Sequence, residues 1–434
     1  MPPQANHDPA IRSLEDENKR LKRAVEELSV LNDLARAIGA SLNTQDIVQT
    51  IVRRSLRAVG AEQGVITLVE ERSEQSMKTL VRTMVSSGEQ EQFHFSQALL
   101  GWMHLNKKPL VINDPRTDER FRGIPWDGSI HSLIAVPMMV KSELRGVLTV
   151  YNKKEGKSFA DDDQRLLAII AAQSGQVVEN ARLHEQEQAL MKMQEDLRLA
   201  ARIQTELLPH TPPSIPGYEI IGTSIPAQQV GGDYYDFIPI DDHRWAFCIG
   251  DVTGKGLPAS LLMANLQATL RGQTTPTVGP KACLERSNQL LFQSTSPEKF
   301  ATLFYAILDP RDHRLSYANA GHENPYLCCN RPEKTRLKTG GIPLGMLPEF
   351  PFEQDCISLE EGSLIVAFSD GVSEAMNARE EQFGEERIVA VIDRHRDAPV
   401  SEIIDHLVAA VKSHAAGHPQ SDDITVVVVR RRKQ

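Results

Sequence analysis

The 434-residue sequence lacks the features that mark several common classes of protein. It has only five cysteines, all beyond residue 247 and none in C-x-x-C spacing, which argues against a disulfide framework or a cysteine zinc site. No apolar run approaches the about 20 residues that span a bilayer. Basic residues are not in excess, and the formal net charge of -10 argues against a protein that binds nucleic acid or an anionic membrane. The polar N-terminus has no apolar signal-peptide core, so we expect a cytoplasmic protein.

Short apolar runs with an aspartate at one end stand out in the second half of the sequence. Apolar, β-branched runs of this length, bounded by Gly, Ser and Asp, are typical of buried strands. Aspartates at strand ends can meet from distant parts of the chain, and such carboxylates resist ionising together unless a cation binds between them. This oxygen-rich pattern predicts Mg²⁺ or Mn²⁺, although each aspartate taken singly is also a common way to begin a turn. The acids are Asp233 after a pair of glycines, Asp251 in the run 245–251, Asp370 in the run 363–370, and Asp422 before the run 424–429.

Leucines recur at every seventh residue in two places, which predicts helices that pair. The first repeat has asparagine at some of the alternating core positions, a pattern that favours a parallel two-stranded coiled coil. An amphipathic helix that packs on its own domain is the alternative. The second repeat lies in a helical pattern that runs from about residue 161 to Pro209, and we expect a homodimer formed through these helices. The repeats are Leu14, Leu21 and Leu28, and Leu183, Leu190 and Leu197.

The length of the chain suits two or three domains, and the sequence divides into four parts. A Pro-rich stretch at 211–217 follows the long helical pattern and predicts a stiff boundary before the last domain. The expected parts are a disordered start with a coiled-coil helix at 1–29, an α/β domain at 30–185, a helical coiled-coil linker at 186–212, and a second domain at 213–434.

The first domain has a helical pattern at 46–60 and strand patterns at 64–70, 78–86, 132–138 and 144–151. The segments 41–43, 135–137 and 146–148, together with Phe159 before an acid-rich helix start, resemble a GAF domain. This resemblance implies an α/β sensor domain with a central antiparallel sheet.

The GAF resemblance leaves the ligand of the first domain unassigned. Members that bind cyclic nucleotides carry an Asn-Lys pair, a later Phe and an Asp-Glu pair. Asn152, Lys153 and Asp163 match this pattern, but Gln164 replaces the glutamate. The domain has no cysteine for a thioether-linked bilin. A domain without a ligand that serves dimer packing is the alternative to a sensor.

The sequence of the second domain predicts strands separated by helices, an order that suits antiparallel sheets covered by helices. Its motifs resemble, in this order, the stage II sporulation (SpoIIE-like) branch of the metal-dependent PPM phosphatases, which are relatives of the type 2C serine/threonine phosphatases. The expected helices are 257–272, 280–294, 384–395 and 400–415, and the motifs are 231–236, 250–256, 319–322, 339–345, 368–374 and 421–425, preceded by a lead-in helix at 201–209.

The phosphatase resemblance implies an α-β-β-α sandwich with two Mn²⁺ or Mg²⁺ ions at one end of its sheets. Carried over by motif, Asp251 bridges the two ions. Asp233 and the backbone carbonyl of Val252 hold one ion, and Asp370 and Asp422 hold the other. An ion-bound water is then the nucleophile, so no cysteine or serine nucleophile is needed.

Four further positions are implied to support this metal centre. Asp423 is grouped with the metal-binding acids, but eukaryotic relatives often carry Asn there, so we rank it behind the direct ligands. Asp236 either supports the site or only orients a strand. Gly232 and Gly371 are expected to let the backbone approach the ions or turn sharply.

Two departures leave the proton donor and the phosphate-gripping residue unassigned. Eukaryotic relatives have a histidine just after the bridging Asp-Gly, where residues 252–253 stand here, and an upstream arginine with no counterpart in 226–230. Lys255 lies close to Asp251 in sequence, although a solvent-facing loop lysine is the simpler interpretation. His322 is a second candidate donor, with a hydrogen-bonded turn histidine as the simpler interpretation.

The resemblance implies an enzyme that hydrolyses phosphoserine or phosphothreonine on a protein. In this branch the usual substrate is a phosphorylated anti-sigma-factor antagonist, and we expect the GAF domain to control activity through the helix from 161 to 208. The alternative is a non-catalytic dimeric GAF scaffold, but a scaffold would usually have lost a metal-binding aspartate, and all the expected acids are present. A GAF-linked histidine kinase or nucleotide cyclase would need signatures that this sequence does not have.

Overall fold

The computed structural model describes Leu14, Glu17, Asn18 and residues 44–69, 97–124, 126–296, 298–329 and 334–433. The chain divides into two compact units, residues 1–192 and 193–434. Most of the first leucine repeat, the motif at 41–43 and the strand expected at 78–86 lie outside the described residues. Among the described residues, no helix is long and apolar enough to cross a bilayer.

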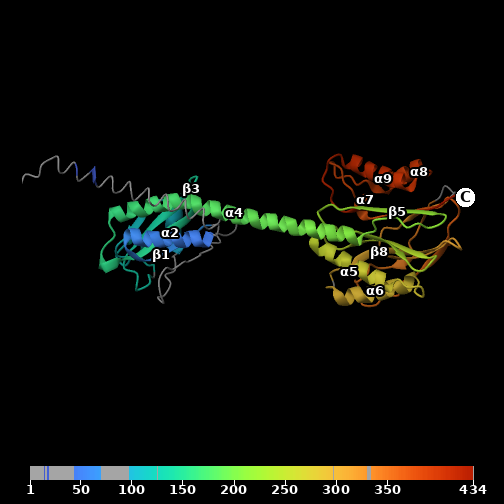
Figure 1. Ribbon diagram of the computed structural model, residues 1–434, viewed down its shortest axis with the longest axis horizontal. Helices are drawn as coiled ribbons and strands as arrows, with labels where there is room; N and C mark the ends of the chain where they lie inside the picture. Colours follow the sequence, from blue (N-terminus) through green and yellow to red (C-terminus); the bar gives the residue numbers. More distant parts are fainter. Residues whose placement is uncertain are drawn as a thin grey trace, which may run out of the picture. The chain divides into compact units, whose positions relative to one another are not determined.

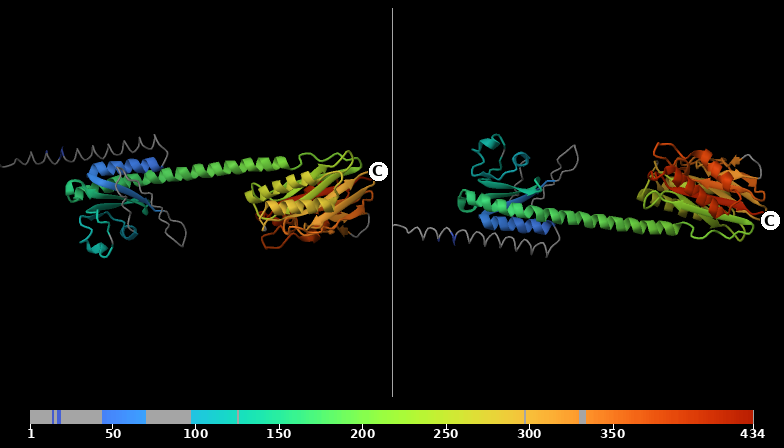
Figure 2. Two further views of the ribbon diagram at one scale, coloured as in Figure 1. Left: turned by 90° about the horizontal axis from the view of Figure 1, so that it is seen from below. Right: turned by 90° about the horizontal axis from the view of Figure 1, so that it is seen from above.

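The first unit contains a four-stranded antiparallel sheet in the order β1-β4-β3-β2. The helix α2 lies beside the first part of α4 on one face (Figures 1 and 2), and their apolar side chains share a core with that face. A second core lies on the other face, beneath α3. The elements are α2 (Thr44–Val59), β1 (Ala61–Leu68), α3 (Gln97–Asn106), β2 (Leu110–Ile112), η1 (Glu119–Phe121), β3 (Leu133–Val140), β4 (Glu143–Lys153), η2 (Lys154–Gly156) and α4 (Asp161–Leu207).

Local sequence explains these elements. In α2, Ile47, Ile51 and Val52 are buried at helical spacing, which aligns one apolar face with the sheet. The β3–β4 hairpin turns at Lys141 and Ser142, whose φ values of 46° and 70° suit the two-residue turns that match strand twist. The expected helix and strands of this domain are therefore found where they are described, and the sheet is antiparallel as the GAF resemblance implied.

The second unit is an α-β-β-α sandwich, which confirms the fold class expected from the sequence. One sheet has the order β11-β10-β14-β15-β5, and the other has the order β12-β9-β8-β7-β6 with β13 paired to β9. An apolar core fills the space between the sheets. The helices α5 and α6 cover the outer face of one sheet, and α7, α8 and α9 cover that of the other (Figure 1).

The strands and helices of the second unit follow the sequence patterns closely. All three apolar runs that end or begin at an aspartate are strands, and all four expected helices are present. The strands are β5 (Tyr218–Ile225), β6 (Tyr234–Pro239), β7 (Trp245–Val252), β8 (Ala301–Asp309), β9 (Arg314–Ala320), β10 (Tyr326–Cys328), β11 (Lys334–Arg336), β12 (Gly340–Gly341), β13 (Asp355–Ser358), β14 (Leu364–Phe368) and β15 (Ile424–Arg431). The helices are α5 (Leu257–Gln273), α6 (Pro280–Ser294), α7 (Asp370–Ser373), α8 (Gly384–His395) and α9 (Val400–Ala415).

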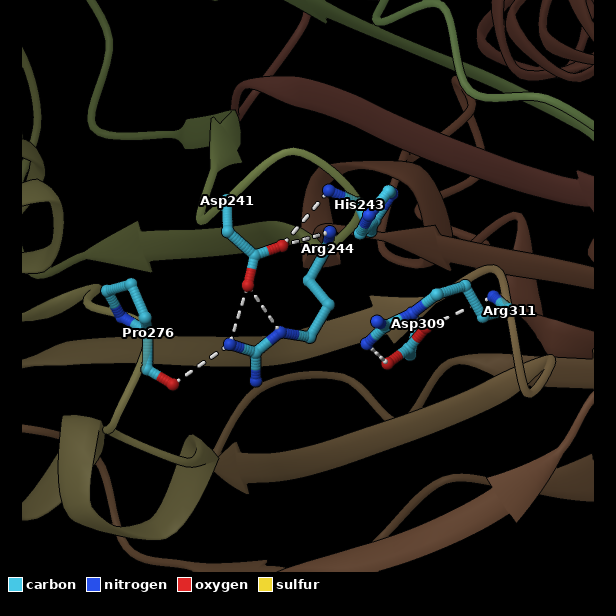
Figure 3. Close-up of polar contacts among 6 residues, drawn as sticks. All are labelled: Asp241, His243, Arg244, Pro276, Asp309 and Arg311. Atoms are coloured by element: carbon cyan, nitrogen blue, oxygen red, sulfur yellow. Dashed lines mark hydrogen bonds and ion pairs between the residues drawn. The ribbon is translucent and has the colours of Figure 1, made fainter.

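The two ends of β7 have different chemistry. At its start, Arg244 donates to the carboxylate of Asp241 and to the carbonyl of Pro276, and Arg311 nearby pairs with Asp309 (Figure 3). Acids and bases neutralise each other there and tie the β6–β7 turn to the segment between α5 and α6. At the other end of β7 stands Asp251, in a group that also includes Asp370 and Asp422.

Candidate active site

Four separate segments bring acidic side chains to the end of the sandwich where β7 finishes. Asp251 is the penultimate residue of β7, and Asp370 is the first residue of α7 after β14. Burial raises the pKa of Asp251 to about 7, and the neighbouring carboxylates of Asp370 and Asp422 add to the increase. Burial also raises the pKa of Asp370, with Asp422 as the next cause. These acids are therefore close enough to oppose one another's ionisation.

Asp233 is the most deeply buried of these acids, with 4% of its surface exposed. Its Oδ2 atom is buried and has no hydrogen-bond partner among the described residues. Burial raises its pKa well above the usual range, and the charge of Asp251 adds to this, while the Ser369 and Thr425 hydroxyls oppose it. A buried carboxylate oxygen without a donor is costly unless a proton or a cation binds it.

Asp423 has a different environment from its neighbour Asp422. Its Oδ1 accepts from the N–H of Ala227 at 2.7 Å, and its Oδ2 accepts from the N–H groups of Gly232 at 2.6 Å and Asp233 at 3.2 Å. Both oxygens are thus engaged by backbone. Asp423 holds the loop that presents Asp233, and its rank behind the direct ligands stays a prediction.

The glycines of the motifs stand where backbone and carboxylates crowd together. A Cβ atom on Gly232 would lie 3.1 Å from the carbonyl oxygen of Val252 and 3.2 Å from Oδ1 of Asp251. A Cβ atom on Gly371 would collide with the carbonyl oxygen of Asp423. Both positions therefore need glycine for close approach, and Gly232 directly borders Asp251 and the Val252 carbonyl.

Lys255 lies at the acidic end of the sandwich. Its ammonium nitrogen is 2.9 Å from Oδ2 of Asp422 and donates to the carbonyl of Ser421 at 2.6 Å. Half of its side chain is exposed, but the charged group is engaged. Lys255 is thus both exposed to solvent and paired with Asp422, and its role as a proton donor stays a prediction.

Asp236 is paired with a base and a tyrosine. It is fully buried and forms a two-pronged ion pair with Arg271 of α5, at 2.7 Å and 3.1 Å. The Tyr234 hydroxyl donates to the same carboxylate at 2.7 Å. The Arg271 side chain is half exposed, but its two-pronged pair with the buried Asp236 links α5 to β6, which gives Asp236 an architectural role.

His322 is buried beside the backbone of Asp251. Its Nδ1 is 3.0 Å from the Thr302 hydroxyl, which lies 3.3 Å from both the N–H and the carbonyl oxygen of Asp251. Burial lowers the pKa of His322 to about 4, so the ring is neutral at pH 7. Its Nε2 has no hydrogen-bond partner among the described residues. The role of His322 as the proton donor stays a prediction.

Gln204, at the end of α4, was not singled out by the sequence beyond its place in the lead-in helix. Its side-chain amide donates to the carbonyl of Gly231 at 2.7 Å and accepts from the N–H of Gly231 at 3.0 Å. Nearby, Gln267 of α5 donates to the carbonyl of Leu207 at 2.5 Å. The last turn of α4 is thus bonded both to the loop that carries Asp233 and to α5.

The available ligands at this end are all oxygens, which suits a hard divalent cation. Among the described residues, however, no three acidic, histidine or cysteine side chains are gathered to hold an ion as they stand. In the set of Asp251, Asp370 and Asp422, the carboxylate of Asp422 is paired with Lys255. The other candidate ligand set has only two carboxylates, those of Asp233 and Asp251, and its third ligand would be the backbone carbonyl of Val252. The oxygen ligands and the unpartnered oxygen of Asp233 fit divalent cations. On metal binding, the carboxylate of Asp422 would exchange its contact with the Lys255 ammonium for a contact with the cation.

Comparison with known protein families gives two matches. The profile of the family described as stage II sporulation protein E (SpoIIE) matches residues 241–432, and that of the GAF domain matches residues 41–179. These ranges cover the two units in the order that the sequence motifs indicated.

Curated relatives match across about half of the chain. Protein IcfG of Synechocystis sp. is 29% identical over 263 residues, which are 54% of this chain and 41% of IcfG. The phosphoserine phosphatase RsbU of Bacillus subtilis is 30% identical over 257 residues, which are 57% of this chain and 75% of RsbU. The phosphoserine phosphatase RsbP of the same organism is 24% identical over 248 residues, which are 56% of this chain and 59% of RsbP. The chain thus spans less than half the length of IcfG.

Among solved structures, the SiaA-PP2C domain of Pseudomonas aeruginosa aligns with a TM-score of 0.48 and 24% identity. The alignment covers 56% of this chain and 97% of that domain.

Proposed function

Because the chain belongs to the SpoIIE family of PPM-type phosphatases and carries a GAF domain before its phosphatase domain, we propose that it is a metal-dependent protein phosphatase. Its reaction is the hydrolysis of phosphoserine or phosphothreonine on a signalling protein. The observation that carries this proposal is the meeting of Asp251, Asp370 and Asp422 at one end of the sandwich, where Asp370 and Asp422 raise the pKa of Asp251 and Asp422 raises that of Asp370.

The proposed ligand sets follow the positions of the acids. Asp251 is the acid that the two proposed sets share: a Cβ atom on Gly232 would lie 3.2 Å from its Oδ1, and Asp370 and Asp422 raise its pKa. Asp233, Asp251 and the carbonyl of Val252 would hold one ion. Asp251, Asp370 and Asp422 would hold the other. Two such ions would supply an activated water and offset charge on the phosphoryl group.

The protein's own contribution is positioning. Asp423 fixes the loop of Asp233 through three backbone N–H groups. Lys255 places a positive charge at the mouth of the site, where an incoming phosphate would meet it. No covalent intermediate is needed, so the buried cysteines take no part in the reaction.

The proposed substrate is a phosphoserine-bearing protein. The names of the relatives RsbU and RsbP describe phosphoserine phosphatases. Within the family that the motifs resemble, the usual substrate is a phosphorylated anti-sigma-factor antagonist, and we extend that substrate class to this chain. The reaction then belongs in a cytoplasmic pathway that regulates a sigma factor.

We further propose that the GAF domain controls this activity through α4. The helix is continuous from Asp161 to Leu207, and its last turn bonds the loop of Asp233 through Gln204. Pairing of α4 with α4 of a second copy is the proposed route to a homodimer. The feature that supports it is the exposure of Leu183, Leu190 and Met193, which are 51–62% exposed.

The function is tested by phosphate release from p-nitrophenyl phosphate and from a phosphoserine peptide, with Mn²⁺ and Mg²⁺ titrated separately. Asp251→Asn and Asp370→Asn should each reduce metal-dependent kcat/KM at least about a hundredfold, because each removes a ligand charge. Asp312→Asn is the matched control, since this acid is exposed in the turn after β8, away from the candidate site. Turnover that survives in Asp251→Asn would disprove the assignment.

The alternative of a non-catalytic scaffold makes the opposite prediction. It requires no metal-dependent turnover with any phosphoester, while metal-independent binding of a partner persists. The retention of all four acids favours the enzyme over the scaffold.

A further inference from the structure

A side pocket of about 230 Å³ opens beside the proposed active site. It lies between α7, the last turns of α9 and the segment that leads to Asp422. Its floor is apolar and buried, with Val411 at 1% and Ile424 at 3% exposed, and Met376 at its rim is 37% exposed. Its walls also include Gly371, Ala415 and Ser421.

The side pocket is continuous with the acidic end of the sandwich. Gly371 directly follows Asp370, and Ser421 directly precedes Asp422. The carbonyl of Ser421 accepts from the ammonium of Lys255, which also pairs with Asp422. A peptide whose phosphate reaches the acids and Lys255 therefore passes within a residue or two of this opening.

The size and chemistry of the side pocket indicate one kind of occupant. An apolar cavity of about 150 Å³ is enough for a benzene ring, so 230 Å³ accommodates a leucine, methionine or phenylalanine side chain. Lys412 of α9 also lines the opening and adds positive charge, which suits a segment that carries a phosphate.

We propose that the side pocket binds an apolar side chain close to the phosphoserine of the substrate protein and so selects which phosphoserine is hydrolysed. This inference rests on the proposed phosphatase function and adds a specificity site to it. The energy of burying that side chain would position the phosphate at the acids, so an apolar flanking residue should raise kcat/KM for peptides.

The test is a set of phosphoserine peptides in which each of several positions on either side of the phosphoserine is varied among Leu, Phe, Ala and Gln. With the full-length chain and Mn²⁺, one flanking position should favour Leu or Phe over Gln by about tenfold in kcat/KM. p-Nitrophenyl phosphate, which has no flanking residue, is the reference substrate.

The key variant is Ala415→Phe, which fills the side pocket from the last turn of α9. Its kcat/KM for the preferred peptide, relative to that for p-nitrophenyl phosphate, should fall at least about fivefold, and the preference for Leu or Phe should disappear. Ala409→Phe is the matched control, because Ala409 is exposed on the same helix and outside the side pocket. Met376→Lys, which brings a charge to the rim, should reduce the preference independently of helix packing.

The outcomes separate the two proposals. One outcome is that the full-length chain hydrolyses p-nitrophenyl phosphate but treats all peptides alike or hydrolyses none of them. This result would overturn the proposed specificity site and leave the proposed phosphatase function standing. A preference that persists unchanged in Ala415→Phe also overturns it. Absence of metal-dependent turnover with every substrate overturns the proposed function itself.

Discussion

At the scale of single residues, neighbouring aspartates have different roles because their carboxylates contact different groups. Asp422 and Asp423 are adjacent, yet Asp422 meets Lys255 while Asp423 meets three backbone N–H groups. Asp251 faces other carboxylates, and burial together with their charges raises its pKa to about 7. The same residue type thus serves as proposed ligand or as a support, depending on its partners.

The raised pKa of Asp251 predicts a pH-dependent stability in the absence of divalent cations. An unfolded aspartate has a pKa of about 3.9, so between about pH 4 and pH 7 the folded chain holds a proton that the unfolded chain releases. The folded state therefore loses stability as pH rises through this window. By calorimetry with a chelator, the unfolding temperature of the phosphatase domain should fall from about pH 5 to pH 8, and Mn²⁺ should restore it most at the higher pH.

Asp251→Asn provides the control for this pH dependence. The variant cannot ionise at the position, so its unfolding temperature should decline less with pH than that of the parent chain. An equal decline in both proteins would show that Asp251 is not the titrating group.

At the scale of elements, helix α4 and strand β15 meet at one loop. Gln204 in the last turn of α4 holds Gly231 by both its N–H and its carbonyl, and Asp423 before β15 holds the next two N–H groups. The loop that presents Asp233 is thus fixed from two sides by residues far apart in the sequence. Such a loop can respond to displacement of α4.

Gln204→Ala should lower metal-dependent kcat by about five- to tenfold and weaken metal affinity, because it removes two hydrogen bonds of about 1 kcal/mol each from the loop of Asp233. Metal affinity is measured by calorimetric titration, which does not depend on turnover. Gln194→Ala is the matched control, since Gln194 is exposed on the same helix. Unchanged metal affinity in Gln204→Ala would show that this contact does not position the ligands.

At the scale of the whole molecule, α4 carries large apolar side chains that are exposed to solvent in a single chain. Leu183 is 51% exposed and Leu190 is 61% exposed, at the seven-residue spacing of a coiled coil. Pairing with a second copy would bury them and would give the GAF domain a means to act on α4.

Replacing both Leu183 and Leu190 with Glu should convert a dimer into a monomer at micromolar concentration, because the charges would face each other across the helix pair. Sedimentation velocity measures the change directly. A chain with Gln188→Glu and Gln194→Glu is the control, because it adds the same charge at positions outside the leucine repeat. A parent chain that is monomeric at high concentration would contradict the proposed dimer.

The sequence by itself determined the elements and the acids. Apolar runs with β-branched residues predicted β7, β14 and β15, and helical periodicity predicted α4 to within a residue of its ends, because strand and helix patterns are local. Asp251, Asp370 and Asp422 were found from their positions at the ends of those runs, and Asp233 from the pair of glycines before it.

Only the tertiary structure decided how these acids are supported. The partners of Asp423 and Gln204 lie 191 and 27 residues away in sequence, and no local pattern predicts which carboxylate or amide will meet which loop. The same holds for Asp236, whose partner Arg271 comes from α5, and for the side pocket, whose walls join two stretches of sequence, 371–376 and 411–424. The physical reason is that periodicity reports which face of an element is buried, whereas a hydrogen bond between elements depends on how the sheets and helices pack together.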